Sequence, residues 1–133
     1  MTILTKKILI VDDDADIREA VHLALEEQDF IDITITESSD VDSAIQQMKN
    51  MHPDIVILDL HMPNKTGFDF MDIMRKDKRL AATKVIMLTA DDTLGNVFKA
   101  QDMGIGAYHF LGKPFNISDL QALVLDLSLP MNR

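Results

Sequence analysis

The sequence predicts an α/β fold in which a five-stranded parallel sheet is covered by helices on both faces. Short apolar runs alternate with longer amphipathic segments along the whole chain, which is typical of parallel strands joined by helical crossovers. The connections between these segments are short, and no internal repeat interrupts them. The length of 133 residues suits a single domain. We therefore expect residues 1–133 to form one domain with a core of about 7–129.

Five segments are predicted to be strands. Ile8–Val11 and Ile55–Leu58 are continuous apolar runs, as expected for strands that are covered on both faces. Ile31–Thr36 alternates apolar with polar residues, which indicates a half-buried strand nearer an edge of the sheet. Val85–Leu88 and Tyr108–Leu111 are the fourth and fifth predicted strands.

The first three predicted helices have recognisable starts. Asp14 can accept a backbone hydrogen bond as the N-cap of the first. Ser39 and Asp42 have the spacing of a capping box before the second. Gly67 opens the third, which carries large apolar residues at helical spacing.

The last two predicted helices differ in strength. Thr93–Met103 is the weaker, because Gly95 lies inside it and it has few large apolar residues. Asn116 or Ser118 is expected to cap the final helix, which should end near Leu129.

Composition excludes several classes of function. The formal net charge is −9, which disfavours nucleic acid and anionic membranes as direct partners, because phosphate binding depends on lysine and arginine. The absence of cysteine excludes disulfides and thiolate metal sites. No run approaches the roughly 20 apolar residues of a membrane span. We expect a cytoplasmic protein.

Chemically useful side chains follow the predicted strands directly. Asp12 and Asp13 follow the first strand, and Asp59 follows the third. Thr89 and Lys113 follow the fourth and fifth. The carboxyl ends of parallel strands form one edge, where such sheets bind ligands. Converging carboxylates repel one another and require a cation, and oxygen ligands without nearby histidine or cysteine favour Mg²⁺. Together with the Thr89 hydroxyl and the Lys113 ammonium group, these carboxylates have the chemistry needed to form and stabilise a phosphorylated aspartate.

Four motifs carry a resemblance to bacterial response-regulator receiver domains. They are Ile8–Asp14 (ILIVDDD), Asp54–Gly67 (DIVILDLHMPNKTG), Val85–Ala90 (VIMLTA) and Lys113–Phe115 (KPF). The resemblance covers nearly the whole chain, and the four motifs occur in the family's order. It implies a flavodoxin-like (βα)5 fold, doubly wound, with strand order 2-1-3-4-5. That order comes with the resemblance, because a receiver protein is itself a standard example of it.

The resemblance also implies roles for the acidic residues. Asp59 would accept the phosphoryl group. Asp13 would bind Mg²⁺ directly, with Mn²⁺ as an alternative ion, while Asp12 would act mostly through a metal-bound water. The backbone carbonyl of His61 would be a further ligand, and the His61 side chain would modulate the reaction rate.

Other matched positions would complete the site. Thr89 and Lys113 would contact the phosphoryl oxygens. The Lys113–Pro114 peptide bond is expected to be cis, and Pro63 and Gly67 would shape the loop after the acceptor.

The sequence departs from the family pattern between Thr89 and Lys113, where the interval is about two residues longer than usual. Gly104–Gly106 is the expected place of the insertion. The family has a switch aromatic residue three positions before the lysine. Counting back from Lys113 predicts Phe110, and counting forward from Thr89 leaves Tyr108 as the alternative.

The implied function is that of a phosphorylation-dependent switch. A sensor histidine kinase or a phosphotransfer protein would supply the phosphoryl group, and an output domain or effector protein would bind the changed face. That face comprises the Thr93–Met103 helix, the fifth strand and the last helix. The protein would not be a conventional enzyme, although it would promote its own dephosphorylation. The alternative is a receiver-like interaction module that works without phosphorylation. A haloacid-dehalogenase-type phosphatase is disfavoured, because His61 stands where such enzymes have a second aspartate.

The same face is predicted to form a homodimer that phosphorylation favours, with a heterologous partner or a further domain as the alternative occupant. One stripe of the last helix suffices to dock it on the sheet; its residues are Leu120, Leu123, Val124 and Leu127. Ile117, Leu125 and Leu129 are left partly outside that stripe.

Overall fold

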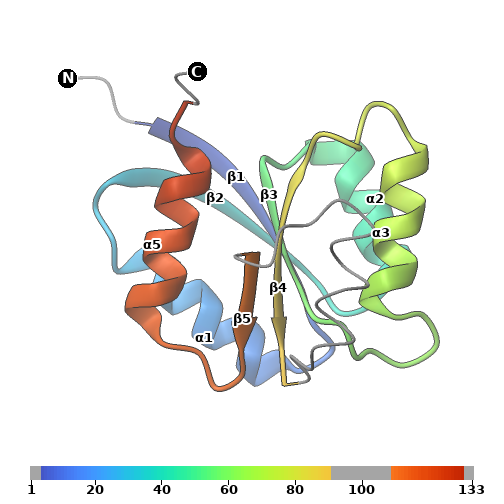
Figure 1. Ribbon diagram of the computed structural model, residues 1–133, viewed down its shortest axis with the longest axis horizontal. Coiled ribbons are helices and arrows are strands. Elements are labelled where there is room, and N and C mark those ends of the chain that lie inside the picture. The colour runs from blue at the N-terminus through green and yellow to red at the C-terminus, as the bar shows by residue number, and fades with distance from the viewer. Residues whose placement is uncertain (1–3, 91–108, 131–133) are drawn as a thin grey trace.

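The computed structural model describes residues 4–90 and 109–130. The strands are β1 (Leu4–Val11), β2 (Ile31–Ser38), β3 (Ile55–Leu58), β4 (Lys84–Thr89) and β5 (Phe110–Gly112). They form one parallel sheet in the order β2-β1-β3-β4-β5 (Figure 1). The predicted α/β fold and strand order are therefore confirmed. Strand β1 begins at Leu4, four residues before the predicted start, because its first half pairs with β2.

Four helices lie within the described residues. They are α1 (Ala15–Glu26), α2 (Val41–Met51), α3 (Gly67–Lys76) and α5 (Ile117–Ser128). The predicted helix over Thr93–Met103 lies outside the described residues. None of the described helices is long and apolar enough to cross a membrane.

The helix caps follow the sequence, with one correction. Asp14 caps α1 and Asn116 caps α5, as predicted. The cap of α2 is Asp40 instead of Ser39, because the Asp40 carboxylate accepts the backbone N–H of Ser43 at 2.7 Å. A capping box that the sequence analysis did not identify opens α3, with Thr66 as its N-cap.

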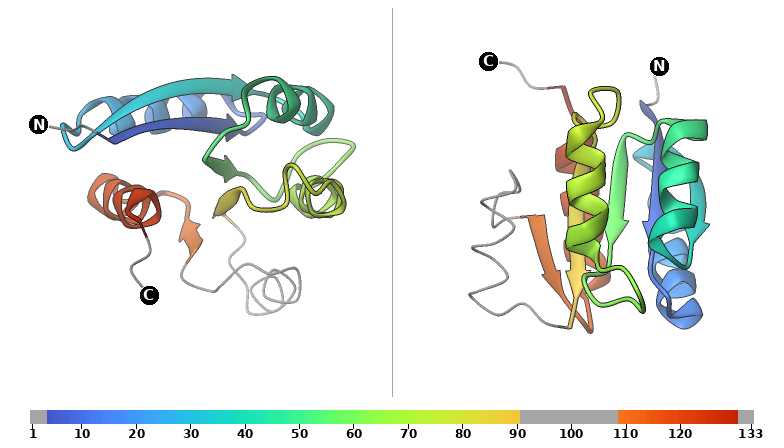
Figure 2. Two further views of the ribbon diagram at one scale, coloured as in Figure 1. Left: turned by 90° about the horizontal axis from the view of Figure 1, so that it is seen from above. Right: turned by 90° about the vertical axis from the view of Figure 1, so that its right-hand side faces the viewer.

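Helices cover both faces of the sheet (Figures 1 and 2). Successive strand residues point to opposite faces, so each buried strand contributes to two cores. The core on the α2 and α3 side includes Leu9, Val11, Val56, Leu58, Val85 and Met87 from the strands. The core on the α1 and α5 side includes Ile8, Ile10, Ile55, Ile57, Ile86 and Leu88. Strand β2 is at an edge of the sheet, as its alternating pattern predicted.

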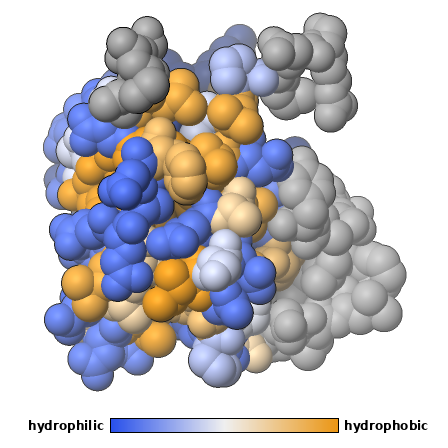
Figure 3. Space-filling view, turned by 90° about the vertical axis from the view of Figure 1, so that its left-hand side faces the viewer, coloured by the Kyte–Doolittle hydropathy of each residue, from blue (hydrophilic) through white to orange (hydrophobic). Residues whose placement is uncertain are grey.

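Helix α5 docks through the predicted stripe, of which Leu120, Val124 and Leu127 are buried and Leu123 is partly buried. Leu125, expected to lie partly outside that stripe, is partly buried and packs against the α1 and α5 core. Ile117 and Leu129 remain 45% and 46% exposed. Ile117 lines a groove of about 410 Å³ between α1 and α5, together with Leu23 and Phe115. On this side of the molecule, apolar areas alternate with polar ones (Figure 3).

Candidate metal and phosphoacceptor site

The predicted site residues are brought together at the carboxyl ends of four strands. Three backbone hydrogen bonds hold them there. The N–H of Asp59 donates to the carbonyl of Val11 at 2.9 Å, and the N–H of Asp12 donates to Ser38 at 3.1 Å. The N–H of Lys113 donates to Thr89 at 3.0 Å. The sheet hydrogen bonding therefore continues one residue past the strands and fixes the residues that carry the chemistry.

Three carboxylates converge at this edge. One oxygen from each of Asp12, Asp13 and Asp59 lies within 4.8 Å of the others. The side chains of Asp12 and Asp59 are buried, and that of Asp13 is exposed. All the donor atoms are carboxylate oxygens, which suits a hard cation such as Mg²⁺ or Mn²⁺. The donor set therefore fits a divalent metal that enters from the solvent side beside Asp13.

Lys113 supplies the positive charge of the site. Its Nζ lies 2.7 Å from Asp12 Oδ2 and 3.5 Å from Asp59 Oδ2, and its side chain is 16% exposed. Burial acts to lower the pKa of Lys113, but the hydrogen bond and charge of Asp12, helped by Asp59, raise it above its ordinary value. The lysine is therefore a fixed cation that faces two buried carboxylates.

Asp59 is destabilised as an anion. Burial is the main cause that raises its pKa above the ordinary value, and the nearby charge of Asp12 is the second. Lys113 and the backbone N–H of His61 act in the opposite direction without cancelling these effects. The N–H of His61 donates to Asp59 Oδ1 at 3.3 Å. A cation bound among the carboxylates would remove this imbalance, which is a second reason why the site fits a metal ion.

The loop after Asp59 turns sharply toward α3. Asn64 has a left-handed backbone (φ 72°), and the N–H of Lys65 donates to the carbonyl of Pro63 at 2.9 Å across it. At Gly67, an added Cβ would lie 2.5 Å from the Asp59 carbonyl oxygen. These contacts agree with the expectation that Pro63 and Gly67 shape the loop.

The switch candidate Phe110 lies on the same side of the sheet as Thr89. Thr89 is fully buried at the end of β4. Phe110 pairs with Met87, two residues before Thr89, and packs against the α2 and α3 core. The β5 residue that pairs with Thr89 is Gly112. Because glycine has no side chain, no β5 side chain lies directly beside Thr89. The switch role of Phe110 stays a prediction.

Two expectations lie outside the described residues, namely Tyr108 as the switch residue and the insertion at Gly104–Gly106. The Lys113–Pro114 peptide bond is cis, as the resemblance implied.

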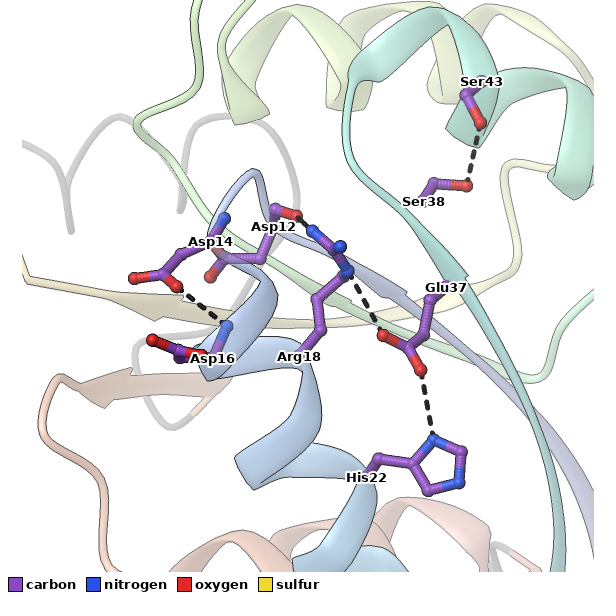
Figure 4. Close-up of polar contacts among 8 residues, drawn as sticks. All are labelled: Asp12, Asp14, Asp16, Arg18, His22, Glu37, Ser38 and Ser43. Atoms are coloured by element: carbon purple, nitrogen blue, oxygen red, sulfur yellow. Dashed lines mark hydrogen bonds and ion pairs between the residues drawn. The ribbon is translucent and has the colours of Figure 1, made fainter.

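The sequence analysis missed Arg18 and Glu37, which reach the site from α1 and β2 (Figure 4). Arg18 donates to the backbone carbonyl of Asp12 and to the Glu37 carboxylate. The sequence contains only a weak signal for this contact. An arginine in the first turn of a helix that an aspartate caps is common on protein surfaces, so it does not by itself indicate a role in the site.

A family comparison agrees with this geometry. The family model for the response regulator receiver domain matches residues 8–125. This chain belongs to that family. It is therefore a receiver domain of the two-component response regulators.

Relatives and solved structures give the same result. The chain is 31% identical over 121 residues to the phosphate regulon transcriptional regulatory protein PhoB of Klebsiella pneumoniae, covering 91% of this chain and 51% of that protein. It is 34% identical to the DNA-binding dual master transcriptional regulator RpaA of Synechocystis, covering 89% and 47%. It thus spans about half the length of these relatives. The chemotaxis protein CheY4 of Vibrio cholerae has a TM-score of 0.81 at 27% identity, over 92% of this chain and 98% of that one.

Proposed function

We propose that this receiver domain accepts a phosphoryl group on Asp59 from a phosphohistidine. A sensor histidine kinase or a phosphotransfer protein would be the donor. A carboxylate oxygen of Asp59 attacks phosphorus, the P–N bond breaks, and the imidazole leaves with the electron pair. The observation that carries the proposal is the burial of Asp59 beside Asp12 and Lys113, because this surrounding holds the acceptor fixed and oriented.

Asp12, Asp13, Asp59 and the backbone carbonyl of His61 would hold the magnesium ion. When bound, Mg²⁺ neutralises the charge that the transferred group brings into the site. Asp13 has the largest expected part in binding it, because the carboxylate of Asp12 already accepts two hydrogen bonds. These come from Lys113 Nζ at 2.7 Å and from the backbone N–H of Asp14 at 2.9 Å.

Thr89 and Lys113 would bind the phosphoryl oxygens after transfer. Lys113 lies nearer to Asp12 than to Asp59, and a small movement of its flexible side chain would bring Nζ to a phosphoryl oxygen. His61 is exposed beside the acceptor, where its side chain can influence how readily water reaches the phosphoryl group. It would thereby set the rate at which the domain loses its phosphate.

The output would be a change in packing near Phe110. A phosphoryl oxygen on Asp59 would draw the Thr89 hydroxyl toward it, and Phe110, which pairs with Met87 on the same side of the sheet, would repack in response. This couples a local charge to a packed element with two arrangements. An output domain or effector protein would then bind the face made by Thr93–Met103, β5 and α5.

Intact-mass measurement tests the phosphoacceptor directly. Wild-type protein incubated with acetyl phosphate and Mg²⁺ should gain one phosphoryl group, and Asp59→Asn should gain none. The reaction should stop in EDTA. Wild-type protein that stays unmodified under saturating conditions would instead support an interaction module that works without phosphorylation.

The predicted homodimer has its own test. Ile117, the first residue of α5, and Leu129, its C-cap, are exposed large apolar residues, but Ile117 lines the groove beside α1. We propose that Leu129 contributes to the contact, together with the face made by Thr93–Met103, β5 and α5. Sedimentation with and without beryllofluoride should show a shift toward dimer in the activated state. A monomer in both states at about 100 µM would exclude a dimer tighter than roughly −5.5 kcal/mol.

A further inference from the structure

Two adjacent residues at the end of β2, Glu37 and Ser38, hold the acidic loop that follows β1 (residues 12–14). Ser38 binds it directly, and Glu37 binds it through another side chain. Ser38 acts directly, because its carbonyl accepts the N–H of Asp12 at 3.1 Å. Glu37 acts through Arg18: its Oε1 accepts from Arg18 Nε at 3.2 Å. Arg18 Nη1 in turn donates to the backbone carbonyl of Asp12 at 2.6 Å. Both polar groups of the Asp12 backbone are therefore tied to β2.

Glu37 is itself held from the far side. Its second oxygen lies 3.2 Å from His22 Nδ1, and the other ring nitrogen of His22 lies 2.8 Å from Glu26. Figure 4 shows Glu37 between Arg18 and His22, with Arg18 extending to Asp12. The side chains of His22, Glu37 and Arg18 thus form a continuous row of contacts that ends at the backbone of Asp12.

The backbone carbonyl of Asp12 belongs to the peptide that joins Asp12 to Asp13. The Asp13 side chain is exposed, and within residues 4–90 and 109–130 its carboxylate accepts no hydrogen bond. The backbone therefore sets where this side chain starts. A contact that fixes the orientation of this peptide fixes the direction of the Asp13 Cα–Cβ bond, and with it the region that the carboxylate can reach.

We infer that Arg18, oriented by Glu37, is a positioning residue for the metal ligand Asp13. This rests on the proposed function, because it assigns Arg18 a part in Mg²⁺ binding at the same site. Arg18 does not touch the metal. It holds the Asp12–Asp13 peptide in the orientation that directs the Asp13 carboxylate toward Asp59.

Stability alone does not account for this arrangement. The side chains of Arg18 and Glu37 are 19% and 37% exposed, so solvent partly screens the ion pair and reduces what it contributes to folding. The same chain has exposed pairs of this kind that are remote from the site, such as Arg79 with Asp77. What distinguishes Arg18 is that one of its donors is directed to the backbone of the acidic loop.

The test is a calorimetric titration with MgCl₂ alone. Groups that orient a metal ligand typically change metal affinity by about 10- to 100-fold when removed. We expect Arg18→Ala to weaken Mg²⁺ binding by about tenfold, the lower end of that range, because Ser38 still holds the loop. In the acetyl phosphate reaction, the Mg²⁺ concentration for half-maximal labelling should rise by a similar factor. Labelling at saturating Mg²⁺ should recover.

Conservative variants separate positioning from a general structural effect. Glu37→Gln keeps an oxygen that can accept from Arg18 Nε, so Mg²⁺ affinity should stay near the wild-type value. Glu37→Ala removes that acceptor and should weaken binding several-fold. Arg18→Lys should behave like the alanine variant, because one ammonium group cannot replace both the Nε and Nη1 contacts. Arg79→Ala is the matched control and should leave Mg²⁺ affinity unchanged.

The outcomes are distinct. Unchanged Mg²⁺ affinity in both Arg18→Ala and Glu37→Ala would overturn the inference, even if both variants melt at lower temperature. Should Arg18→Ala fail to fold, the comparison of Glu37→Gln with Glu37→Ala decides, and equal affinities in those two would overturn it. If wild-type protein binds no Mg²⁺ and gains no phosphoryl group, the proposed function has failed instead.

Discussion

Replacing Gly67 with alanine should damage both the fold and the acceptor site. Gly67 is the first residue of α3, and its N–H donates to the carbonyl of Leu60 at 3.0 Å. An added Cβ would lie 2.5 Å from the Asp59 carbonyl oxygen and 3.0 Å from the Cα of Leu60. Both are backbone atoms, so no side-chain rotation can relieve the overlap. The main chain that carries Asp59 must move.

The size of the effect follows from these distances. Ordinary contact with a Cβ begins near 3.4 Å, so the Asp59 carbonyl has to yield most of an ångström. Overpacking of this kind costs about 1–3 kcal/mol, and we expect the upper end because the backbone is rigid here. Reduced freedom of the unfolded chain offsets about 0.4–1 kcal/mol. The free energy of unfolding should therefore fall by about 2 kcal/mol, which lowers Tm by roughly 8 °C for a domain of this size.

Thermal and urea unfolding would measure the stability change, with Asp72→Ala as a control on the same helix. Asp72 is exposed and pairs only with Lys76 among the described residues, so its loss should cost less than about 1 kcal/mol. Labelling of Asp59 by acetyl phosphate should also slow in Gly67→Ala, because the acceptor backbone is displaced. An unfolding free energy equal to that of the wild type would refute the reasoning about the close contact.

Three further predictions concern charge and packing at the site. Burial and the charge of Asp12 raise the pKa of Asp59, so in metal-free buffer the folded protein should lose stability as the pH rises from the ordinary pKa of 3.8 through the raised pKa of the folded state. Asp59→Asn should therefore be more stable than the wild type at neutral pH. Urea unfolding that shows no such gain, or a gain that persists in acid, would contradict this. Lys113→Met leaves two buried carboxylates without their cation. The loss should be about 3 kcal/mol in EDTA, the lower end for a broken buried pair because Lys113 is 16% exposed, and adding Mg²⁺ should recover part of it. Equal stability to the wild type in EDTA would count against the pairing. Phe110→Ala should weaken binding of an output partner and leave labelling of Asp59 nearly intact, whereas an effect confined to Tyr108→Ala would identify Tyr108 as the switch residue.

Much of the fold and of the candidate site could be predicted from the sequence. Continuous apolar runs such as Ile55–Leu58 identify buried parallel strands, because every side chain there meets a helix on one face or the other. The residue after each strand is then placed at a common edge by topology alone. That is why Asp12, Asp59 and Lys113 could be expected to meet although 101 residues separate the first from the last.

Local patterns were less decisive where two neighbouring residues could serve the same purpose. Ser39 and Asp40 both have cap-forming side chains, and only the structure shows that Asp40 accepts the N–H of Ser43. Leu125 is predicted to lie partly outside the docking stripe of α5, and the structure shows how much of it still packs against the core. A one-residue shift of a cap, or a small rotation of a helix, depends on the sum of its tertiary contacts.

Only the tertiary structure revealed the contacts between elements that surround the site. Arg18 contacts Glu37 because α1 packs beside β2 in one particular relative position. The residue pattern within either segment does not determine that position. Gly67 approaches the Asp59 carbonyl because the loop between them folds back on itself. The sequence by itself determined which chemical groups stand at the ends of the strands, since strand alternation and chain order are local properties. How those groups are held, and how closely, was decided by packing between segments that are distant in the chain.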